Sequence, residues 1–225
     1  MGLISYVKEE MQVIMERDAA IKTPMEVFLY PSFKAIMRHR VAHWLYEHKC
    51  FFLARWYSQR TVRKTGIEIH PGATIGKGLF IDHGNGVIIG ETTIIGDNVT
   101  LYQGVTLGGT GKEQGKRHPT IGNNVLIGCG AKVLGPFKVG NGARIAANAV
   151  VLREIPDNST AVGVPAQVVL IAGERVPYAN AVDQINITDP VAETMKALLS
   201  RVEFLEQEMD RRFCTDMEKQ SQKEE

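Results

Sequence analysis

Two short polar segments carry the side chains best suited to acid–base chemistry and to anion binding. The first is IDHGNG, in which Asp82 and His83 stand side by side. An imidazole titrates near neutral pH, so His83 is a candidate general base. The second is GGTGKEQGKRHPT, residues 108–120, which contains Arg117 and His118. Because a guanidinium can hold a carboxylate through two parallel hydrogen bonds, this loop is a candidate binding site for an anionic group.

Both segments interrupt a repeat of aliphatic residues with a period of six. The repeat slips by two residues at Val87 and pauses between Leu107 and Ile121. Neither a helix nor an alternating strand has this period, but stacked short coils do, because each coil buries its aliphatic row against the next. The aliphatic row consists of Ile69, Ile75, Ile81, Ile89, Ile95, Leu101, Leu107, Ile121, Ile127, Val133, Val139, Ile145 and Val151.

The repeat predicts a parallel β-helix over residues 65–170, with the loop 108–120 extruded from it. Residues four positions after the aliphatic ones are small or apolar, and we expect them to share the same interior. Glycines after the aliphatic residues are expected where a corner needs positive φ or close backbone approach. The first set includes Ala73, Val99, Val105, Val125, Ala131, Ala143 and Ala149, and the second is Gly76, Gly90, Gly96, Gly122, Gly128 and Gly140.

Helical patterns flank the repeat. Residues 1–64 predict an N-terminal α-helical domain of three to four helices, the first ending near Ala20. The C-terminal segment, residues 171–225, contains a predicted helix over 190–213 and ends in a polar, disordered tail. In that helix apolar residues follow a heptad spacing, which fits packing on its own subunit or self-association at a symmetry axis. The heptad residues are Val191, Met195, Leu198, Val202, Leu205 and Met209.

Composition narrows the class of protein. The 225 residues include 26 basic and 25 acidic ones, a net charge of +1, which argues against nucleic acid or a membrane surface as the main partner. The chain has no run of 18 apolar residues and no signal-peptide pattern, so we expect a cytoplasmic protein. Three cysteines, Cys50, Cys129 and Cys214, lie far apart without CxxC spacing. They suit a reducing compartment and predict neither a disulfide framework nor a metal site.

Four segments together resemble the serine O-acetyltransferases. They are ERDAA (16–20), GIEIHPGATIGKGLFIDHGNGVIIGE (66–91), GVTLGGTGKEQGKRHPTIG (104–122) and AVGVPAQVV (161–169). The resemblance implies transfer of acetyl from acetyl-CoA to the L-serine hydroxyl, the first committed step of cysteine biosynthesis. It also implies that the β-helix is left-handed, whereas general crossover rules favour the right hand.

The resemblance assigns roles at the period slip. It implies that His83 is the general base and that Glu68, fifteen positions earlier, orients its ring as a carboxylate partner does in other histidine bases. Many relatives have aspartate at that position, so this chain differs by one methylene. Asp82 and Asp18, the latter in the helical domain, are implied contacts of the serine ammonium.

The same resemblance assigns the loop. Arg117 is expected to hold the serine α-carboxylate, and His118 to bind serine or stabilise the oxyanion. The implied mechanism is a ternary complex without an acyl-enzyme. Coenzyme A is expected along the outside of the coils, between neighbouring subunits. Its implied contacts are Gly109 (also assigned to serine), Thr110, Cys129 and Ala147, with Lys132 or Arg144 near the phosphates.

Assembly and regulation follow from the same resemblance. Many relatives use a longer N-terminal region to pair trimers into hexamers, whereas the helical region of this chain is short. We therefore expect a homotrimer, with a dimer of trimers as the alternative. L-Cysteine is expected as a feedback inhibitor in the serine pocket. Many relatives end in an isoleucine that enters cysteine synthase, whereas Lys-Glu-Glu at 223–225 argues against that docking mode.

Other functions stay open at this point. In a zinc-dependent β-helix carbonic anhydrase, His70, His83 and His118 would have to converge across a subunit interface. An acetyltransferase for a sugar or an antibiotic would have no substrate carboxylate for Arg117. A purely structural β-helix would leave the polar slip at Asp82 and His83 without a role.

Overall fold

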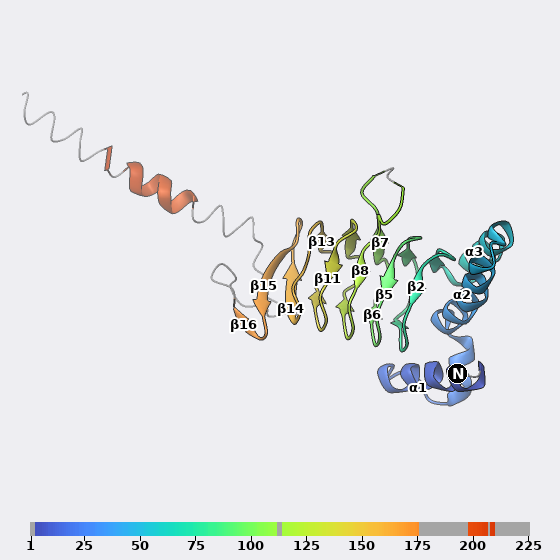
Figure 1. The fold of residues 1–225 in the computed structure, drawn as a ribbon. Coiled ribbons are helices and arrows are strands. Elements are labelled where there is room, and N and C mark those ends of the chain that lie inside the picture. The colour runs from blue at the N-terminus through green and yellow to red at the C-terminus, as the bar shows by residue number, and fades with distance from the viewer. Residues whose placement is uncertain (1–2, 112–113, 176–197, 207, 210–225) are drawn as a thin grey trace, which may run out of the picture. The chain divides into compact units, whose positions relative to one another are not determined.

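The computed structural model describes residues 3–111, 114–175, 198–206 and 208–209 (Figure 1). The chain forms two compact units, Met1–Ala179 and Asn180–Glu225. The first unit begins with helices and continues as a parallel β-helix. Its helices are α1 (Leu3–Arg17), the 3-10 helix η1 (Pro24–Leu29), α2 (Pro31–Glu47) and α3 (Phe51–Thr65).

The β-helix is a prism of three sheets whose strands pair with the coil before and the coil after. The first sheet contains β1 (Glu68–Ile69), β4 (Ile88–Ile89), β7 (Thr106–Gly108), β10 (Lys132–Leu134) and β13 (Val150–Val151). The second contains β2 (Thr74–Ile75), β5 (Ile94–Ile95), β8 (Thr120–Ile121) and β11 (Lys138–Val139). The third contains β3 (Phe80–Ile81), β6 (Thr100–Leu101), β9 (Leu126–Ile127), β12 (Arg144–Ile145), β14 (Ser159–Val162), β15 (Gln167–Ile171) and β16 (Glu174–Arg175).

The parallel stacking ends before residue 170. Strand β14 still pairs in parallel with β12, but β15 pairs antiparallel with β14, and β16 antiparallel with β15. The six-residue period contains no signal for this hairpin, because the aliphatic spacing has already ended. The hairpin extends the third sheet beyond β14, its last parallel strand.

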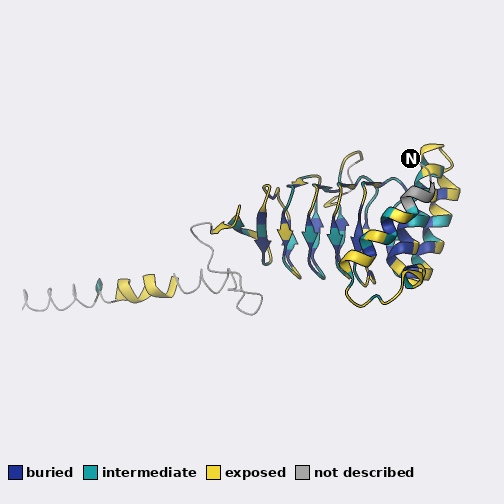
Figure 2. Cartoon of the chain, turned by 90° about the horizontal axis from the view of Figure 1, so that it is seen from below, coloured by how far each residue is buried: buried dark blue, intermediate teal, exposed yellow. Residues whose placement is uncertain are grey.

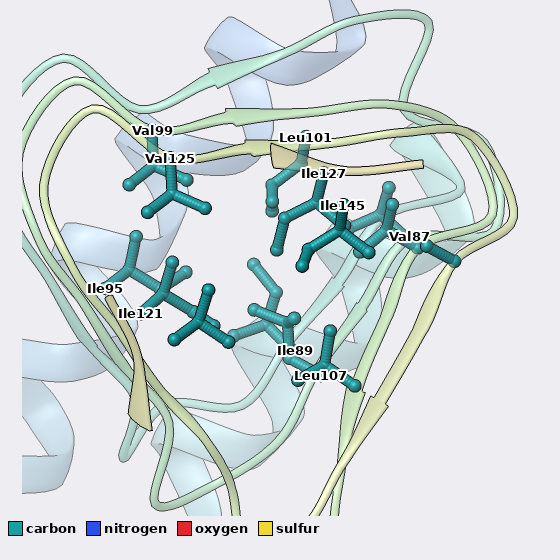
Figure 3. Packing of buried hydrophobic residues seen from close by; sticks show 14 of the residues in the cluster. Val87, Ile89, Ile95, Val99, Leu101, Leu107, Ile121, Val125, Ile127 and Ile145 are labelled. Atoms are coloured by element: carbon teal, nitrogen blue, oxygen red, sulfur yellow. The ribbon is translucent and has the colours of Figure 1, made fainter. Parts of the chain in front are cut away.

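The repeat residues fill the interior of the prism as predicted. Side chains from successive coils lie directly over one another, such as Ile95 with Ile121 and Val99 with Val125 (Figure 3). Along the strands, buried residues alternate with less buried ones when the chain is coloured by burial (Figure 2). All thirteen aliphatic row residues and all seven small residues named above are buried. Each coil therefore gains its stability mainly from the next coil.

The helices close the first coil. Ala35 and Ile36 of α2 belong to the same core as the prism, and the Arg40 guanidinium donates to the carbonyls of Ile75 and Gly76, both at 2.8 Å. Helix α1 packs through Ile14 against Phe80 of β3. This contact brings the end of α1 to the corner that follows β3.

Three corners join the sheets. The 1–2 corner comprises residues 70–73, 90–93, 109–119 and 135–137, and the 2–3 corner comprises 76–79, 96–99, 122–125 and 140–143. The 3–1 corner comprises 82–87, 102–105, 128–131 and 146–149. None of the six glycines singled out in the sequence has a positive φ. They are required by close approach instead, since a Cβ on any of them would lie within 2.8 Å of a neighbouring coil or of His118.

In the second unit, residues 198–206 are helical and form an exposed helix (Figure 2). Leu198, Val202, Leu205 and Met209 are all exposed. The other heptad residues, Val191 and Met195, and the tail after residue 209 lie outside the described residues. No helix among the described residues is both long and apolar enough to cross a membrane.

Candidate active site

His83 is one of two residues inserted into the 3–1 corner. The Asp82 N–H donates to Leu101 O at 2.8 Å, as the Tyr102 N–H donates to Ile127 O at 3.1 Å, so Asp82 and Tyr102 are equivalent. Gly104 N–H donates to Asn85 O just as Gly130 N–H donates to Gln103 O, so Asn85 and Gln103 are also equivalent. The extra residues between these positions are His83 and Gly84. The two-residue slip in the period is therefore caused by the insertion of His83, the candidate base, and Gly84.

The insertion displays the imidazole to solvent. His83 has φ 57°, a left-handed conformation that few non-glycine residues adopt, and its side chain is 74% exposed. Its Nε2 lies 4.0 Å from the Asp82 carboxylate. Gly84 follows with φ 78°, and a Cβ there would lie 2.5 Å from Ile67 Cδ1. The local backbone thus turns His83 out of the prism, as a base that must reach a substrate requires.

The helical domain adds Asp18 to this corner. Asp18 follows α1 and accepts hydrogen bonds from the Tyr30 hydroxyl at 2.6 Å and from the Ala20 N–H at 2.8 Å. These bonds, with a smaller contribution from nearby His83, hold the pKa of Asp18 below its usual value. The Asp18 carboxylate raises the pKa of Tyr30 to about 12. Asp18, Asp82 and His83 therefore lie within electrostatic reach of one another, with Asp18 ionised.

The second predicted segment builds the 1–2 corner. His118 is buried against Gly90, where a Cβ would lie 2.0 Å from the ring. Its Nδ1 accepts from the Thr92 N–H at 3.2 Å and lies 2.9 Å from Thr92 Oγ1. Burial, together with the neighbouring Arg117, lowers the pKa of His118. Both effects favour the neutral form of the ring.

Arg117 is held at the same corner by a carboxylate. Its Nη2 pairs with the Glu91 carboxylate, whose other oxygen accepts from the Tyr46 hydroxyl at 2.8 Å. Arg117 and then Tyr46 lower the pKa of Glu91, so this carboxylate is ionised. The remaining guanidinium N–H groups include Nη1, whose contact with Gly115 O is long, at 3.5 Å. The ion pair with Glu91 orients the guanidinium and leaves its Nη1 edge available to bind another anion.

The structure does not bring all predicted site residues together. His83, Asp82 and Asp18 lie at the 3–1 corner, and Arg117 and His118 lie at the 1–2 corner. Glu68 is on β1, between these corners, and its Oε1 lies 3.5 Å from Arg55 Nη2. Two edges of one prism face different directions, so one small substrate cannot contact both groups within a single chain.

The residues expected to bind coenzyme A divide in the same way. Gly109 and Thr110 begin the extruded loop at the 1–2 corner, whereas Cys129 and Ala147 stack above the His83 insertion at the 3–1 corner. Arg144 is exposed on β12. The Lys132 ammonium donates to Gly104 O and to Thr106 Oγ1, the latter at 3.2 Å. Lys132 is thus directed along its own prism.

Sequence reasoning missed four residues that shape these corners. Glu91 and Thr92 follow Gly90 at a regular corner, and the repeat pattern alone gives them no special status. Tyr30 and Tyr46 come from the helical domain, where they look like ordinary helix residues. The only sign of Glu91 and Thr92 in the sequence is their position directly after Gly90, a glycine at which a Cβ would overlap a neighbouring side chain.

The comparisons with known proteins bear on the family and the fold of this chain. Residues 118–153 match the family model for the bacterial transferase hexapeptide (six repeats). The serine acetyltransferase of Bacillus subtilis (strain 168) is 51% identical over 206 residues, which is 91% of this chain and 94% of that protein. The chain belongs to the serine acetyltransferase family.

Solved serine acetyltransferases have the same fold. The enzyme of Brucella abortus strain S19, in complex with coenzyme A, matches with a TM-score of 0.72 at 44% identity, over 77% of this chain and 68% of that one. A serine acetyltransferase in complex with cysteine matches with a TM-score of 0.72 at 40% identity, over 74% of this chain and 70% of that one. The predicted fold, a left-handed parallel β-helix with an N-terminal helical cap, is confirmed.

The alternative functions do not fit this family. Among the described residues, no group of three or more His, Cys, Asp or Glu is arranged to hold a metal ion. His70 and His118 lie at the 1–2 corner and His83 at the 3–1 corner, so a three-histidine zinc site would have to combine residues of two subunits. Membership of the serine acetyltransferase family favours neither a carbonic anhydrase nor an acetyltransferase for sugars or antibiotics.

Proposed function

We propose that this chain is a serine O-acetyltransferase that transfers acetyl from acetyl-CoA to the hydroxyl of L-serine, giving O-acetylserine for cysteine biosynthesis. The observation that carries the proposal is the His83–Gly84 insertion, which turns an imidazole outward in a chain that is 51% identical to a serine acetyltransferase. A serine hydroxyl is a poor nucleophile at neutral pH, so the reaction needs a base in this position.

The proposed mechanism is a direct transfer within a ternary complex. His83 removes the hydroxyl proton as the serine oxygen attacks the thioester carbonyl. The resulting tetrahedral oxyanion is stabilised by hydrogen-bond donors of the loop. The carbon–sulfur bond then breaks, and His83 returns the proton to the coenzyme A thiolate. We keep Glu68 as the group that orients His83, a role that requires it to move away from Arg55 or to act from a neighbouring subunit.

We assign serine recognition to the two charged corners. The ionised carboxylate of Asp18, with Asp82, suits the serine ammonium, and the free edge of Arg117 suits its α-carboxylate. Charge complementarity of this kind separates an amino acid from a sugar. L-Cysteine has the same ammonium and carboxylate, so we propose that it competes with serine, in agreement with the cysteine complex of a related enzyme.

We propose that the enzyme is a homotrimer whose active sites lie between subunits. In a threefold ring, the 3–1 corner of one prism meets the 1–2 corner of the next at a heterologous interface. This arrangement would unite His83, Asp82 and Asp18 of one subunit with Arg117 and His118 of its neighbour. It would also unite the two groups of coenzyme A residues, Cys129 and Ala147 with Gly109 and Thr110. Lys132 and Arg144 remain proposed phosphate contacts, and a dimer of trimers remains the alternative.

We propose that the C-terminal helix associates in parallel with its copies. In the heptad frame, Leu198 and Leu205 occupy d and Val202 and Met209 occupy a, which places Arg201 at g and Glu206 at the following e. In a parallel coil, g of one helix faces the next e of its neighbour, so Arg201 would meet Glu206. Under mild oxidation Leu205→Cys should cross-link between subunits and Glu203→Cys, on the outer face, should not. Equal cross-linking would contradict the parallel seam.

A cytoplasmic location is also part of the proposal. Cys50 and Cys129 are free thiols, as expected in a reducing compartment.

The assay for the proposed function is thiol release from acetyl-CoA in the presence of L-serine. Replacing His83 by alanine should lower kcat by about 10²–10⁴-fold, since it removes the general base. His48→Ala is the matched control, because His48 is an exposed histidine at the end of α2. Serine-independent thiol release, or a His83→Ala enzyme as fast as His48→Ala, would contradict the proposal.

A further inference from the structure

Thr92 makes more contacts to the loop than its ordinary place in the repeat would suggest. Its Oγ1 lies 3.0 Å from the Arg117 backbone nitrogen and 3.1 Å from the His118 backbone nitrogen. The same oxygen lies 2.9 Å from His118 Nδ1, and the Thr92 backbone nitrogen lies 3.2 Å from that ring nitrogen. One threonine thus contacts the backbone of both loop residues and the ring of one of them.

Counting donors and lone pairs fixes the direction of each bond. A hydroxyl oxygen has two lone pairs and one hydrogen. Both lone pairs of Thr92 Oγ1 accept backbone N–H groups, so its hydrogen is left to donate to His118 Nδ1. The Thr92 N–H donates to the same nitrogen. Nδ1 therefore carries no proton, and in a neutral ring the proton must be on Nε2.

The surroundings oppose any other state of the ring. An imidazolium would direct an Nδ1–H at two donors, the hydroxyl and the N–H of Thr92. Burial and the nearby Arg117 guanidinium lower the pKa of His118, which also disfavours the imidazolium. Gly90 leaves space for the ring on one side, because a Cβ there would overlap it. The position, tautomer and charge of His118 are thus set together.

We propose that Thr92 is a positioning residue that fixes His118 as the neutral Nε2–H tautomer, so that His118 serves the reaction as a hydrogen-bond donor. The two site histidines then have separate tasks. His83 is exposed and exchanges a proton, whereas His118 presents a fixed N–H to an oxygen of the substrate or transition state. A neutral donor suits an oxyanion that develops during acetyl transfer, since it needs no proton uptake. This task rests on the proposed function, but the tautomer does not.

The tautomer can be measured without turnover. ¹⁵N spectra of the enzyme labelled with [¹⁵N]histidine, with the His118 signals identified from a His118→Gln sample, report which ring nitrogen is protonated. Wild type and Thr92→Ser should show the Nε2–H form at pH 7, because serine keeps the hydroxyl. Thr92→Val removes the hydroxyl and leaves only the backbone N–H of residue 92 as a donor to Nδ1, so part of the ring population should shift to the Nδ1–H tautomer. It should also lower kcat/KM for serine by about tenfold or more, since a misoriented donor stabilises the transition state poorly.

Thr93→Val is the matched control. The Thr93 hydroxyl is next in the chain, buried, and has no hydrogen-bond partner, so its loss should change neither the tautomer nor kcat/KM. An Nδ1–H form or an imidazolium in the wild type at pH 7 would overturn the proposal. So would Thr92→Val with wild-type tautomer, or with a changed tautomer and unchanged kinetics. If Thr92→Val fails to fold, the wild-type and Thr92→Ser spectra still decide. An enzyme without serine-dependent turnover would refute the proposed function and leave the spectra to judge the tautomer.

Discussion

The 2–3 corner and the 1–2 corner of the prism use the same local geometry for different purposes. At the 2–3 corner, a side-chain oxygen of each coil accepts the backbone N–H of the coil before it. At the 1–2 corner, one coil extends into the loop 109–119, and the loop returns His118 to a comparable position. The ladder of the 2–3 corner runs through Asp97, Asn123, Asn141 and Asp157, with distances of 2.7–2.8 Å.

In both corners a glycine leaves room for the incoming group. A Cβ on Gly96 would lie 2.4 Å from Asn123 Oδ1, and a Cβ on Gly90 would lie 2.0 Å from the His118 ring. In the ladder the incoming group stabilises the stack itself. At Gly90 it is the imidazole of His118, for which we propose a role in the reaction. The fold therefore needs little alteration to hold a functional side chain, since a position that normally receives a structural oxygen receives a ring.

Among the changes that compare the two corners, Gly90→Ala should have the largest effect on activity. The new methyl group would displace the His118 ring, which Thr92 prevents from adjusting freely, so kcat/KM should fall by about 100-fold or more. Gly96→Ala is the matched change at the 2–3 corner. It meets Asn123 and the Gly122 backbone, so it should lower stability by about 1–3 kcal/mol and leave kcat near wild type. Steady-state kinetics and urea midpoints at fixed protein concentration compare the two, and equal kinetic losses would erase the distinction.

A smaller effect is expected from Arg117→Ala. It removes a charge-assisted contact to the serine carboxylate, so KM for serine should rise about 10- to 100-fold while kcat at saturation changes less. Arg153→Ala, at an exposed arginine after β13, is the control and should behave as wild type. If serine KM is the same in both variants, Arg117 is not the carboxylate contact.

The helical domain should differ from the two corners in that its buried histidine affects stability and not catalysis. His39 of α2 is buried, and burial lowers its pKa to about 3, with a smaller contribution from His43 and Arg40. Because the folded-state pKa lies below the unfolded value near 6.5, stability is complete above pH 6.5 and is lost as the pH falls toward 3. From pH 7 to pH 5 the wild type should lose about 2 kcal/mol more than His39→Leu. Urea unfolding at both pH values measures this, and parallel losses in the two proteins would contradict it.

The sequence predicted those parts of the molecule that repeat. Each coil buries its residues against the next, so the positions of Ile95 and Ile121 in the core follow from spacing alone. The interruptions at His83 and Arg117 were also visible, because a regular period makes any departure conspicuous. The identification of His83 and Gly84 as the inserted pair needed the backbone hydrogen bonds, since spacing locates a slip only to within one corner.

Contacts between distant segments were not predictable in this way. Glu91 and Thr92 keep the period, and their importance comes from a loop that returns about 25 residues later, at Arg117 and His118. The Tyr30 hydroxyl donates to Asp18 because the chain bends between α1 and α2, and the six-residue pattern does not extend to this region. The separation of the site over two corners also emerged only in three dimensions, because the sequence shows order along the chain and not direction around the prism.

The most direct test of an active site shared between subunits is a mixture of two damaged enzymes. His83→Ala and Arg117→Ala chains, unfolded together in equal amounts and refolded, form mixed trimers. If His83 of one subunit works with Arg117 of its neighbour, about one quarter of the sites in such mixtures regain both residues. Serine-dependent turnover at low serine concentration should then rise well above that of either variant refolded alone. If turnover remains at the mean of the two separate variants, each site lies within one chain and the proposed sharing of His83 and Arg117 between subunits is wrong.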